Sequence, residues 1–198
     1  MNFPKTAGQC KYMLALRSSK PIIIGTGPAG TGKTMLACNI ATEHILKHPR
    51  ARVVLTRPIV AADEDMGYLP GDMDQKMEPW TRPMYDIFEQ SMTHNQMDRC
   101  ISIEPLGYMR GRTFNHTLII ADEMQNSTPN QMKLLLTRLG EGTKIIVTGD
   151  LEQSDLEGNN GLENLVYKMQ CMEIDYIQHV DCLLYTSPSP LYNSGSRI

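Results

Sequence analysis

The glycine-rich run from Gly27 to Thr34 is the part of the sequence whose residue types and spacing most clearly predict chemistry. Its residues are Gly27, Pro28, Ala29, Gly30, Thr31, Gly32, Lys33 and Thr34, and they fit the Walker A pattern G-x-x-x-x-G-K-[ST]. In such a loop the backbone N–H groups cradle phosphates, the lysine reaches the β- and γ-phosphates, and the last hydroxyl ligates Mg²⁺. The run therefore predicts a nucleoside-triphosphate site, with Lys33 on phosphate and Thr34 on Mg²⁺.

The residues on either side of this loop have the pattern of a strand and then a helix. Ile22–Ile24 is an apolar, β-branched run, and apolar residues repeat at intervals of four from Thr34 to Lys47. This order places the loop at the positive N-terminus of a helix, where anions bind. A glycine turn that binds nothing is the alternative, and it would not need these flanks.

Two carboxylates, Asp122 and Glu123, follow the apolar run Leu118–Ala121. A carboxylate at the end of a strand beside the phosphate loop holds hydrated Mg²⁺, which makes Asp122 the predicted Walker B ligand. Glu123 is predicted to polarise the attacking water, so the pair favours hydrolysis over nucleotide storage. The alternative is that both residues only cap a short helix over 123–126.

A third polar group follows the apolar run Ile145–Val147. It consists of Thr148–Asp150 and, three residues later, Gln153. Polar side chains at the end of a strand beside the phosphate loop can sense the γ-phosphate, which is the role we expect for Gln153. An ordinary turn is the competing interpretation, because turns of this composition are common.

Arginines are expected near such a site, because a guanidinium stabilises the charge that develops in phosphoryl transfer. The segment Tyr108–Phe114 has Arg110 and Arg112 between two aromatic residues and contains no acid. It predicts a surface for single-stranded nucleic acid or an arginine that reaches a neighbouring subunit's nucleotide, and a solvated loop is the alternative. Arg57 and Arg138 are further candidates, and either could instead form an ordinary ion pair.

Short apolar runs predict the strands that position these groups. The runs are Ile22–Ile24, Val53–Leu55, Ile101–Ile103, Leu118–Ile120, Ile145–Val147 and, more weakly, Ile174–Ile177. Continuous runs of this kind are typical of a parallel sheet buried on both faces. Together with the helical pattern after the loop, they predict an α/β fold.

Two further segments lie between the predicted strands. A helix is predicted over 128–139, because Thr128 can cap its N-terminus and Pro129 suits its first position. Gly140 would end that helix. Ala61–Pro83 is rich in Gly, Pro, Asp and Met and has weak periodicity, so we interpret it as a long insertion or lid loop.

Length and composition set the broad class. A chain of 198 residues that is 41% hydrophobic and 21% charged suits one ordinary globular domain. The formal charge of −3 gives no overall basic footprint, so binding of nucleic acid would need a local patch. We expect no membrane segment and a cytoplasmic location, because no apolar run approaches ~20 residues and no secretory signal is seen. Five scattered cysteines predict reduced, structural thiols and no metal site made by them.

Taken together, several motifs resemble the PhoH family. They are Gln9 and Tyr12, the loop Gly27–Thr34, Leu55–Pro58, Gly67–Asp72, Tyr108–Thr113, Asp122–Asn126, Leu136–Gly140 and Val147–Asp150. The resemblance extends over roughly Gln9 to Asp181. It implies a P-loop NTPase fold with a helicase superfamily 1-like core and a parallel sheet of about five strands in the order 5-1-4-3-2.

The resemblance also implies cofactors, partners and two further roles. Gln9 is similar to a glutamine that reads adenine, and Gln153 is similar to a residue that couples the γ-phosphate to nucleic acid. Family members are cytoplasmic ATPases of bacteria and phages that are associated with phosphate starvation, and some act on RNA as ring-shaped oligomers. The implied cofactors are ATP and Mg²⁺. The implied partners are single-stranded RNA or DNA and further copies of the chain, in a ring that could be a hexamer.

The chain departs from the family pattern at two places. Met124 replaces the alanine of D-E-A-Q-N, a change that a flexible apolar side chain tolerates. After Asp181 the family continues as D-V-V-R-H-P, whose arginine is a candidate for γ-phosphate contact, whereas Cys182–Ile198 looks like a translated sequencing-library adapter. We therefore expect a PhoH-like ATPase domain over 1–181 and a non-native, disordered tail over 182–198. Because the tail lacks this arginine, we expect the chain to bind ATP better than it hydrolyses it. A natural Ser/Pro-rich tail is the alternative.

Three functions remain open from the sequence. The first is an ATPase that remodels single-stranded RNA or DNA, which the pair Asp122 and Glu123, Gln153 and the patch with Arg110 and Arg112 favour. The second is a small-molecule kinase, for which the lid segment offers just Arg82. The third is a nucleotide-gated regulatory or interaction module without a nucleic-acid substrate.

Overall fold

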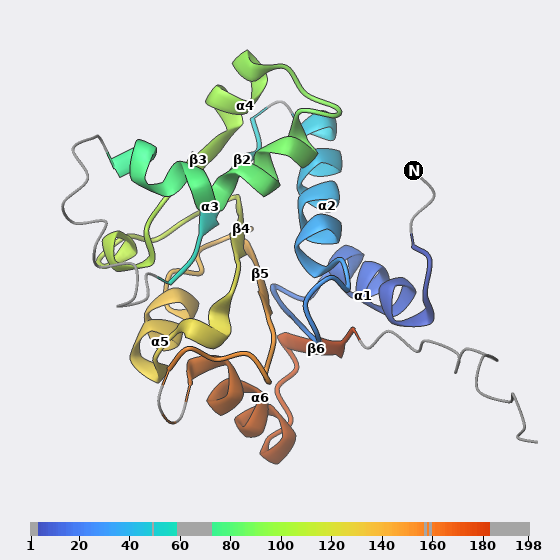
Figure 1. Cartoon of the computed structure of the whole chain (residues 1–198), viewed down its shortest axis with the longest axis vertical. Helices are drawn as coiled ribbons and strands as arrows, with labels where there is room; N and C mark the ends of the chain where they lie inside the picture. Colours follow the sequence, from blue (N-terminus) through green and yellow to red (C-terminus); the bar gives the residue numbers. More distant parts are fainter. Residues whose placement is uncertain (1–3, 49, 59–72, 157, 159, 183–198) are drawn as a thin grey trace, which may run out of the picture.

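A parallel sheet forms the centre of the protein, with helices on both of its faces (Figure 1). The computed structural model describes residues 4–48, 50–58, 73–156, 158 and 160–182, with the backbone alone for 73–79. Within these residues the strands are β1 (Ile22–Thr26), β2 (Arg52–Thr56), β3 (Ile101–Ile103), β4 (Thr117–Ala121), β5 (Lys144–Gly149) and β6 (Ile177–Asp181). Their order across the sheet is β3-β2-β4-β5-β1-β6, and every neighbouring pair is parallel.

The predicted strands are correct except for the last. Each of the first five apolar runs lies within a strand, whereas Ile174 lies in a turn and its carbonyl accepts the N–H of Ile177 (3.3 Å). The strand that follows, β6, includes Gln178 and His179, because an edge strand tolerates polar residues that a central strand does not. The sheet has one strand more than the five expected, since β3 lies at the edge beside β2. The other five have the predicted order 5-1-4-3-2.

The helices form a layer on each face of the sheet. The helices α1 (Ala7–Arg17), α2 (Lys33–Lys47), α3 (Met73–Phe88) and α4 (His94–Cys100) contribute to one apolar core, and α5 (Pro129–Leu136) and α6 (Gly161–Cys171) to the other. Successive strand residues alternate between the cores, so that Ile23 packs in the first while Ile22 and Ile24 pack in the second. The buried runs in the sequence reflect this double coverage.

The sequence predicted the end of the helix after the phosphate loop correctly, but it predicted the end of the helix at Pro129 too late. α2 extends to Lys47 as expected, and Thr128 caps α5 by accepting the N–H of Gln131 (3.2 Å). α5 ends at Leu136 instead of residue 139, because Leu139 leaves the helix to form a bridge with Phe114. Arg138 therefore lies beyond the helix on which it was predicted.

The predicted lid over 61–83 is wrong in its second half. Residues 61–72 lie outside the described residues, and 73–83 belong to α3. Prolines at positions 79 and 83 argued against a helix interior, since proline removes a helix hydrogen bond. The C-terminal part of α3 instead packs on α2, and Met84 and Phe88 are buried in the first core.

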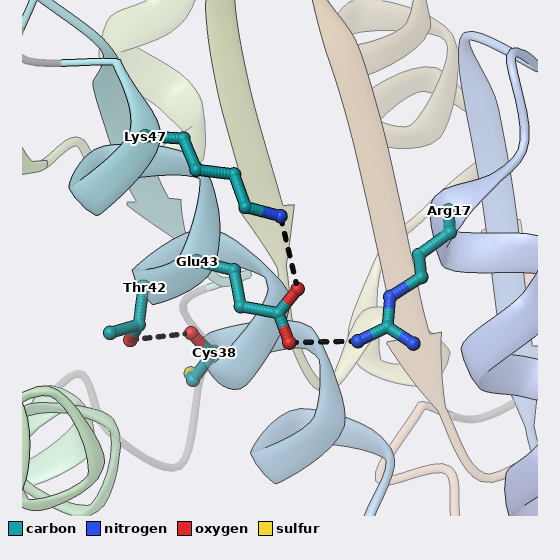
Figure 2. Close-up of polar contacts among 5 residues, drawn as sticks. All are labelled: Arg17, Cys38, Thr42, Glu43 and Lys47. Atoms are coloured by element: carbon teal, nitrogen blue, oxygen red, sulfur yellow. Dashed lines mark hydrogen bonds and ion pairs between the residues drawn. The ribbon is translucent and has the colours of Figure 1, made fainter.

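Helix α1 is held on α2 by apolar packing and an ion pair. Figure 2 shows Glu43 of α2 between Arg17 of α1 (2.8 Å) and Lys47 of its own helix (3.9 Å). These side chains are exposed, so each pair contributes about 0–1 kcal/mol. Burial of Tyr12 and Leu16 beneath α1 is the larger contribution, and it places the start of α1 beside the phosphate loop.

Two predictions about the whole chain can be compared with the described residues. All five cysteines are free thiols, of which Cys38 and Cys182 are buried and Cys10 and Cys171 are exposed. No helix in the described ranges has the length and apolar character needed to cross a membrane.

Candidate nucleotide-binding site

A pocket of about 240 Å³ lies at the carboxyl ends of β1, β4 and β5. It is lined by Ala29, Gly30, Gly32, Lys33, Thr34, Met35, Asp122, Glu123, Gly149, Asp150 and Gln153. The three polar groups predicted from separate parts of the sequence therefore meet in one place. Gly27, Pro28 and Thr31 belong to the same loop but do not line this pocket.

The phosphate loop has the backbone that its glycines allow. Gly30 (φ +76°) and Gly32 (φ +85°) have left-handed conformations that disfavour any side chain. Lys33 is buried, and its Nζ donates to the carbonyls of Gly27 (2.6 Å) and Pro28 (2.9 Å). Lys33 is the first residue of α2, and its side chain reaches back across the loop. A bound phosphate would replace these carbonyls as the partner of its ammonium group.

The predicted Mg²⁺ ligands are in direct contact. Thr34 Oγ1 donates to Asp122 Oδ1 (2.8 Å), and Thr148 Oγ1 donates to the same oxygen. Burial raises the pKa of Asp122, and the hydrogen bonds from Thr148 and Thr34 oppose that rise. A carboxylate and a hydroxyl oxygen beside a phosphate cradle are the hard donors that Mg²⁺ prefers, so these residues fit the ion.

Glu123 has a strained backbone and a held side chain. Its φ of +53° lies in the left-handed region, which is uncommon for a residue other than glycine and is often found at functional sites. It occupies the N-cap position of the single turn at Met124–Asn126, but its side chain makes no capping hydrogen bond. The alternative that Glu123 only caps a helix is therefore not supported.

Gln125 connects Glu123 to the loop that contains Gln153, and sequence reasoning missed it. Its Nε2 donates to Glu123 Oε2 (2.5 Å), and its Oε1 accepts the N–H of Asp150 (3.1 Å). Only 3% of Gln125 is exposed, so both halves of its amide need these partners. The motif D-E-x-Q, with an amide two residues after the candidate base, was the available signal.

Further hydrogen bonds join the same two segments. Ser154 Oγ donates to the carbonyl of Gln125 (3.1 Å). Asn126 and Asp155 form a reciprocal pair, in which Asn126 Nδ2 donates to Asp155 Oδ2 (2.9 Å) and Asp155 N–H donates to Asn126 Oδ1 (3.0 Å). The segment after β4 and the segment after β5 are therefore positioned as one unit, and the Gln153 side chain is exposed at its edge.

Gln9 lies against the phosphate loop but not in the pocket. Its Nε2 donates to the carbonyl of Thr31 (3.0 Å), while its Oε1 accepts the N–H of Lys5 (2.7 Å) and completes the capping box of α1. Its role in reading adenine remains a prediction. Tyr12, one turn later, packs on Gly25, where an added Cβ would lie 2.6 Å from the tyrosine ring.

None of the four arginine candidates lines the pocket. Arg112 pairs with Glu104 (2.6 Å) and lies over Phe114, and Arg138 donates to the carbonyls of Arg112 (2.6 Å) and Leu134 (3.1 Å). Both arginines therefore have partners within the protein, and the role of the segment 108–114 in binding nucleic acid stays a prediction. Glu104 supplies an acid from outside the segment, and Phe114 is buried.

The remaining two candidates have different surroundings. Arg57 lies over the ring of Trp80 (5.5 Å), and its charge acts on the carboxyl group of Asp122. Arg110 is exposed, close in sequence to Tyr108, whose side chain is 63% exposed. Tyr108 and Arg110 are therefore accessible, as is Arg112 in its ion pair with Glu104.

Comparison with known proteins agrees with this architecture. A family model described as "PhoH-like protein" matches residues 3–183. The PhoH-like protein of Bacillus subtilis (strain 168) is 48% identical over 158 residues, which cover 77% of this chain and 49% of the relative. Protein PhoH of Escherichia coli (strain K12) is 42% identical over 159 residues, which cover 77% of this chain and 45% of the relative. The chain thus spans about half the length of these curated relatives.

A solved structure of lower similarity is the Pif1 helicase from Candida albicans. It is 17% identical and has a TM-score of 0.45, with 91% of this chain and 40% of the helicase covered. That likeness carries no argument about function. The expected P-loop NTPase fold with a parallel sheet is confirmed by the topology and the family match. The family match and the identities to curated relatives show that the chain belongs to the PhoH-like protein family.

Proposed function

We propose that the protein binds Mg-ATP in the pocket at the carboxyl ends of the strands and hydrolyses it to ADP and phosphate. The observation that carries this proposal is the meeting of Lys33, Asp122 and Glu123 in one pocket. A loop that binds phosphate serves many chemistries, but a second carboxylate beside the metal ligand can act as the general base that activates water. Gln125 fixes that carboxylate in place, which supports a hydrolytic site over nucleotide storage.

Each side chain has a separate role in this proposal. Lys33 exchanges the loop carbonyls for β- and γ-phosphate oxygens, and Thr34 and Asp122 hold the metal. Bound Mg²⁺ supplies charge that offsets the phosphate oxygens. Glu123 orients and polarises the attacking water, while Gln153 senses the γ-phosphate from the adjoining loop.

We further propose that hydrolysis is coupled to single-stranded nucleic acid, with RNA as the first candidate. The shared framework of the Glu123 and Gln153 segments supports this coupling, because movement of one segment would displace the other. Assembly of several copies into a ring is part of the same proposal and rests on family membership. The cytoplasmic location and the association with phosphate starvation stay predictions.

The domain boundary also stays a proposal. We retain an ATPase domain over 1–181 and a tail over 182–198, of which 183–198 lie outside the described residues. Cys182 itself is buried, and its N–H donates to the carbonyl of Thr26 (2.7 Å) just before the phosphate loop. Replacing the tail with a family-like end and comparing ATP turnover would test whether an arginine there completes the site.

The central test is release of phosphate from ATP by the full chain, with and without single-stranded RNA or DNA. We expect Mg²⁺-dependent turnover that rises several-fold with RNA. A Lys33→Ala preparation measures any contaminating ATPase. Turnover no higher than in that variant would contradict hydrolysis.

Other outcomes of the same assay would favour the alternatives. Slow turnover that RNA and DNA leave unchanged, together with an oligomer size that depends on nucleotide, would favour a nucleotide-gated module. Transfer of phosphate to a metabolite, with little free phosphate, would favour a kinase.

A further inference from the structure

Most arginine side chains in the described residues have a partner. The partnered ones are Arg17 with Glu43, Arg82 with Asp86 and Glu89, Arg112 with Glu104, Arg138 with backbone carbonyls, and Arg57 over Trp80. The guanidinium groups of Arg50, Arg52, Arg99 and Arg110 have no hydrogen bond or ion pair to any described residue. Three of these four, namely Arg50, Arg52 and Arg99, line the same pocket.

This pocket lies at the opposite end of the sheet from the nucleotide site. It has a volume of about 530 Å³ and lies where α2 and α4 end and β2 and β3 begin. Arg50 follows α2, Arg52 is the first residue of β2, and Arg99 is in the last turn of α4. The remaining lining residues carry no formal charge, so the arginines face no acid across the pocket.

Compensation of helix dipoles does not account for this cluster. A cation in the last turn of a helix offsets the partial negative charge of that end, which explains Arg99 on α4. Arg50 lies on the short connection between α2 and β2, and Arg52 is the first residue of β2, so neither belongs to a helix. All three side chains are exposed and therefore available to a ligand.

The cluster continues into a neighbouring depression. A second pocket of about 500 Å³ shares Arg52 and Arg99 with the first and adds Arg112, Ser102 and Thr113. Two acids, Asp98 and Glu104, also line it, and the second of them already pairs with Arg112. We call the surface of Arg50, Arg52 and Arg99 with this extension the amino-edge strip.

We propose that the amino-edge strip binds successive phosphates of a single-stranded nucleic acid, a step that rests on the function proposed above. Guanidinium groups bind phosphate in a bidentate manner, and several of them lining adjoining pockets suit a backbone that carries many phosphates. An acidic protein segment could also pair with guanidinium groups, and competition by poly-glutamate in the test below distinguishes it from nucleic acid. Contacts of this kind position a strand without reading its sequence.

The test measures binding of a fluorescein-labelled single-stranded RNA to the full chain by anisotropy at several salt concentrations. In the variant Arg50→Ala/Arg52→Ala/Arg99→Ala we expect at least about tenfold weaker binding and a salt slope smaller by about 2, at about 0.7 per lost phosphate contact. A matched control, Lys11→Ala/Lys133→Ala/Lys168→Ala, removes the same charge from exposed positions elsewhere and should bind within about twofold of the unmodified chain. Thermal unfolding checks that both variants are folded.

The outcomes separate this inference from the proposed function. Basal ATP turnover without RNA is measured on the same preparations, and we expect the arginine variant to retain it, because the strip is remote from the nucleotide pocket. Equal RNA binding by the two triple variants would overturn the inference while leaving hydrolysis intact. Poly-glutamate competing as well as RNA of equal charge would overturn the assignment to phosphates and favour an acidic protein. If the unmodified chain has no basal ATP turnover, that result would count against the proposed function instead.

Discussion

Two groups of charged side chains, at opposite ends of the sheet, differ in whether the protein holds them. At the carboxyl ends of the strands, Lys33 and Asp122 are buried, and each has several hydrogen-bond partners. At the amino ends, Arg50 and Arg52 are exposed, and their guanidinium groups have no partner among the described residues. A buried charge must be held by its surroundings, whereas an exposed charge remains available to an incoming ligand. The first end is therefore built for fixed chemistry and the second for adjustable binding.

The largest effect is expected when the candidate base of the nucleotide site is removed. Glu123→Gln removes the carboxylate that polarises water but keeps a side chain that can pair with Gln125, so we expect kcat to fall by about 10²–10⁴-fold. Affinity for a non-hydrolysable ATP analogue should change little. Phosphate-release kinetics and calorimetry measure the two quantities. Normal turnover in this variant would show that the base lies elsewhere.

Loss of the loop lysine should act on binding instead. Lys33→Ala removes the cation expected on the β- and γ-phosphates, and we expect nucleotide affinity to fall by about 100-fold. Calorimetric titration with ATP measures this change, and Lys11→Ala, on an exposed face of α1, is the control. A variant that binds ATP like the unmodified chain would contradict the assignment of the site.

Gln125 tests how far the fixed end depends on its supporting hydrogen bonds. Gln125→Leu keeps the volume but leaves Glu123 Oε2 and the N–H of Asp150 without their partner, and we expect kcat to fall by about 10–100-fold. KM should remain within about threefold, because no phosphate contact is removed. Gln125→Glu keeps the acceptor for Asp150 and sets a second carboxylate against Glu123, so it should not rescue turnover. Equal losses in kcat and in ATP affinity would indicate a general structural defect.

Two glycines differ in how much space the protein leaves for an added side chain. Gly25→Ala places a methyl group against the buried Tyr12 ring, and we expect a loss of about 1–3 kcal/mol in the free energy of unfolding. Gly107→Ala is the matched control, because nothing lies within 4 Å of an added Cβ there. Chemical denaturation measures both. Equal stability of the two variants would show that α1 moves aside at little cost.

The smallest expected effect concerns His179, whose ring nitrogen lies 2.7 Å from Thr26 Oγ1 beside the phosphate loop. Burial lowers its pKa below 6.5, and Asp181 opposes that change. The unfolded chain therefore binds a proton more readily, so stability from this group is present above about pH 6.5 and falls as the pH drops below it. His179→Gln should reduce the difference in unfolding free energy between pH 7.5 and 5.5 by on the order of a few tenths of a kcal/mol, since solvent screens the group. An unchanged or larger pH dependence in the variant would contradict this account.

The sequence predicted which residues meet at the carboxyl ends of the strands, because each group is a short motif that directly follows a strand. The loop Gly27–Thr34 and the pair Asp122 and Glu123 each follow a buried strand, and parallel strands bring their carboxyl ends to one edge. The role of Gln125 could not be assigned from its type alone, because one of its two partners, Asp150, lies 25 residues away in the sequence.

The other end was harder to predict because its character depends on tertiary contacts. Arg112 and Arg50 have the same side chain, and only the fold shows that one has an acidic partner and the other has none. For the same reason the helix α3 was missed, since its packing on α2 outweighs the prolines in its sequence.

The contacts of the Lys33 ammonium group have a consequence for turnover. Because it donates to the carbonyls of Gly27 and Pro28, the ammonium group must exchange these partners for phosphate oxygens when nucleotide binds. We expect product release to return the lysine to these carbonyls, so that each catalytic cycle restarts from an ordered cradle. Nucleotide should then raise the melting temperature only by mass action, without a coupled folding transition.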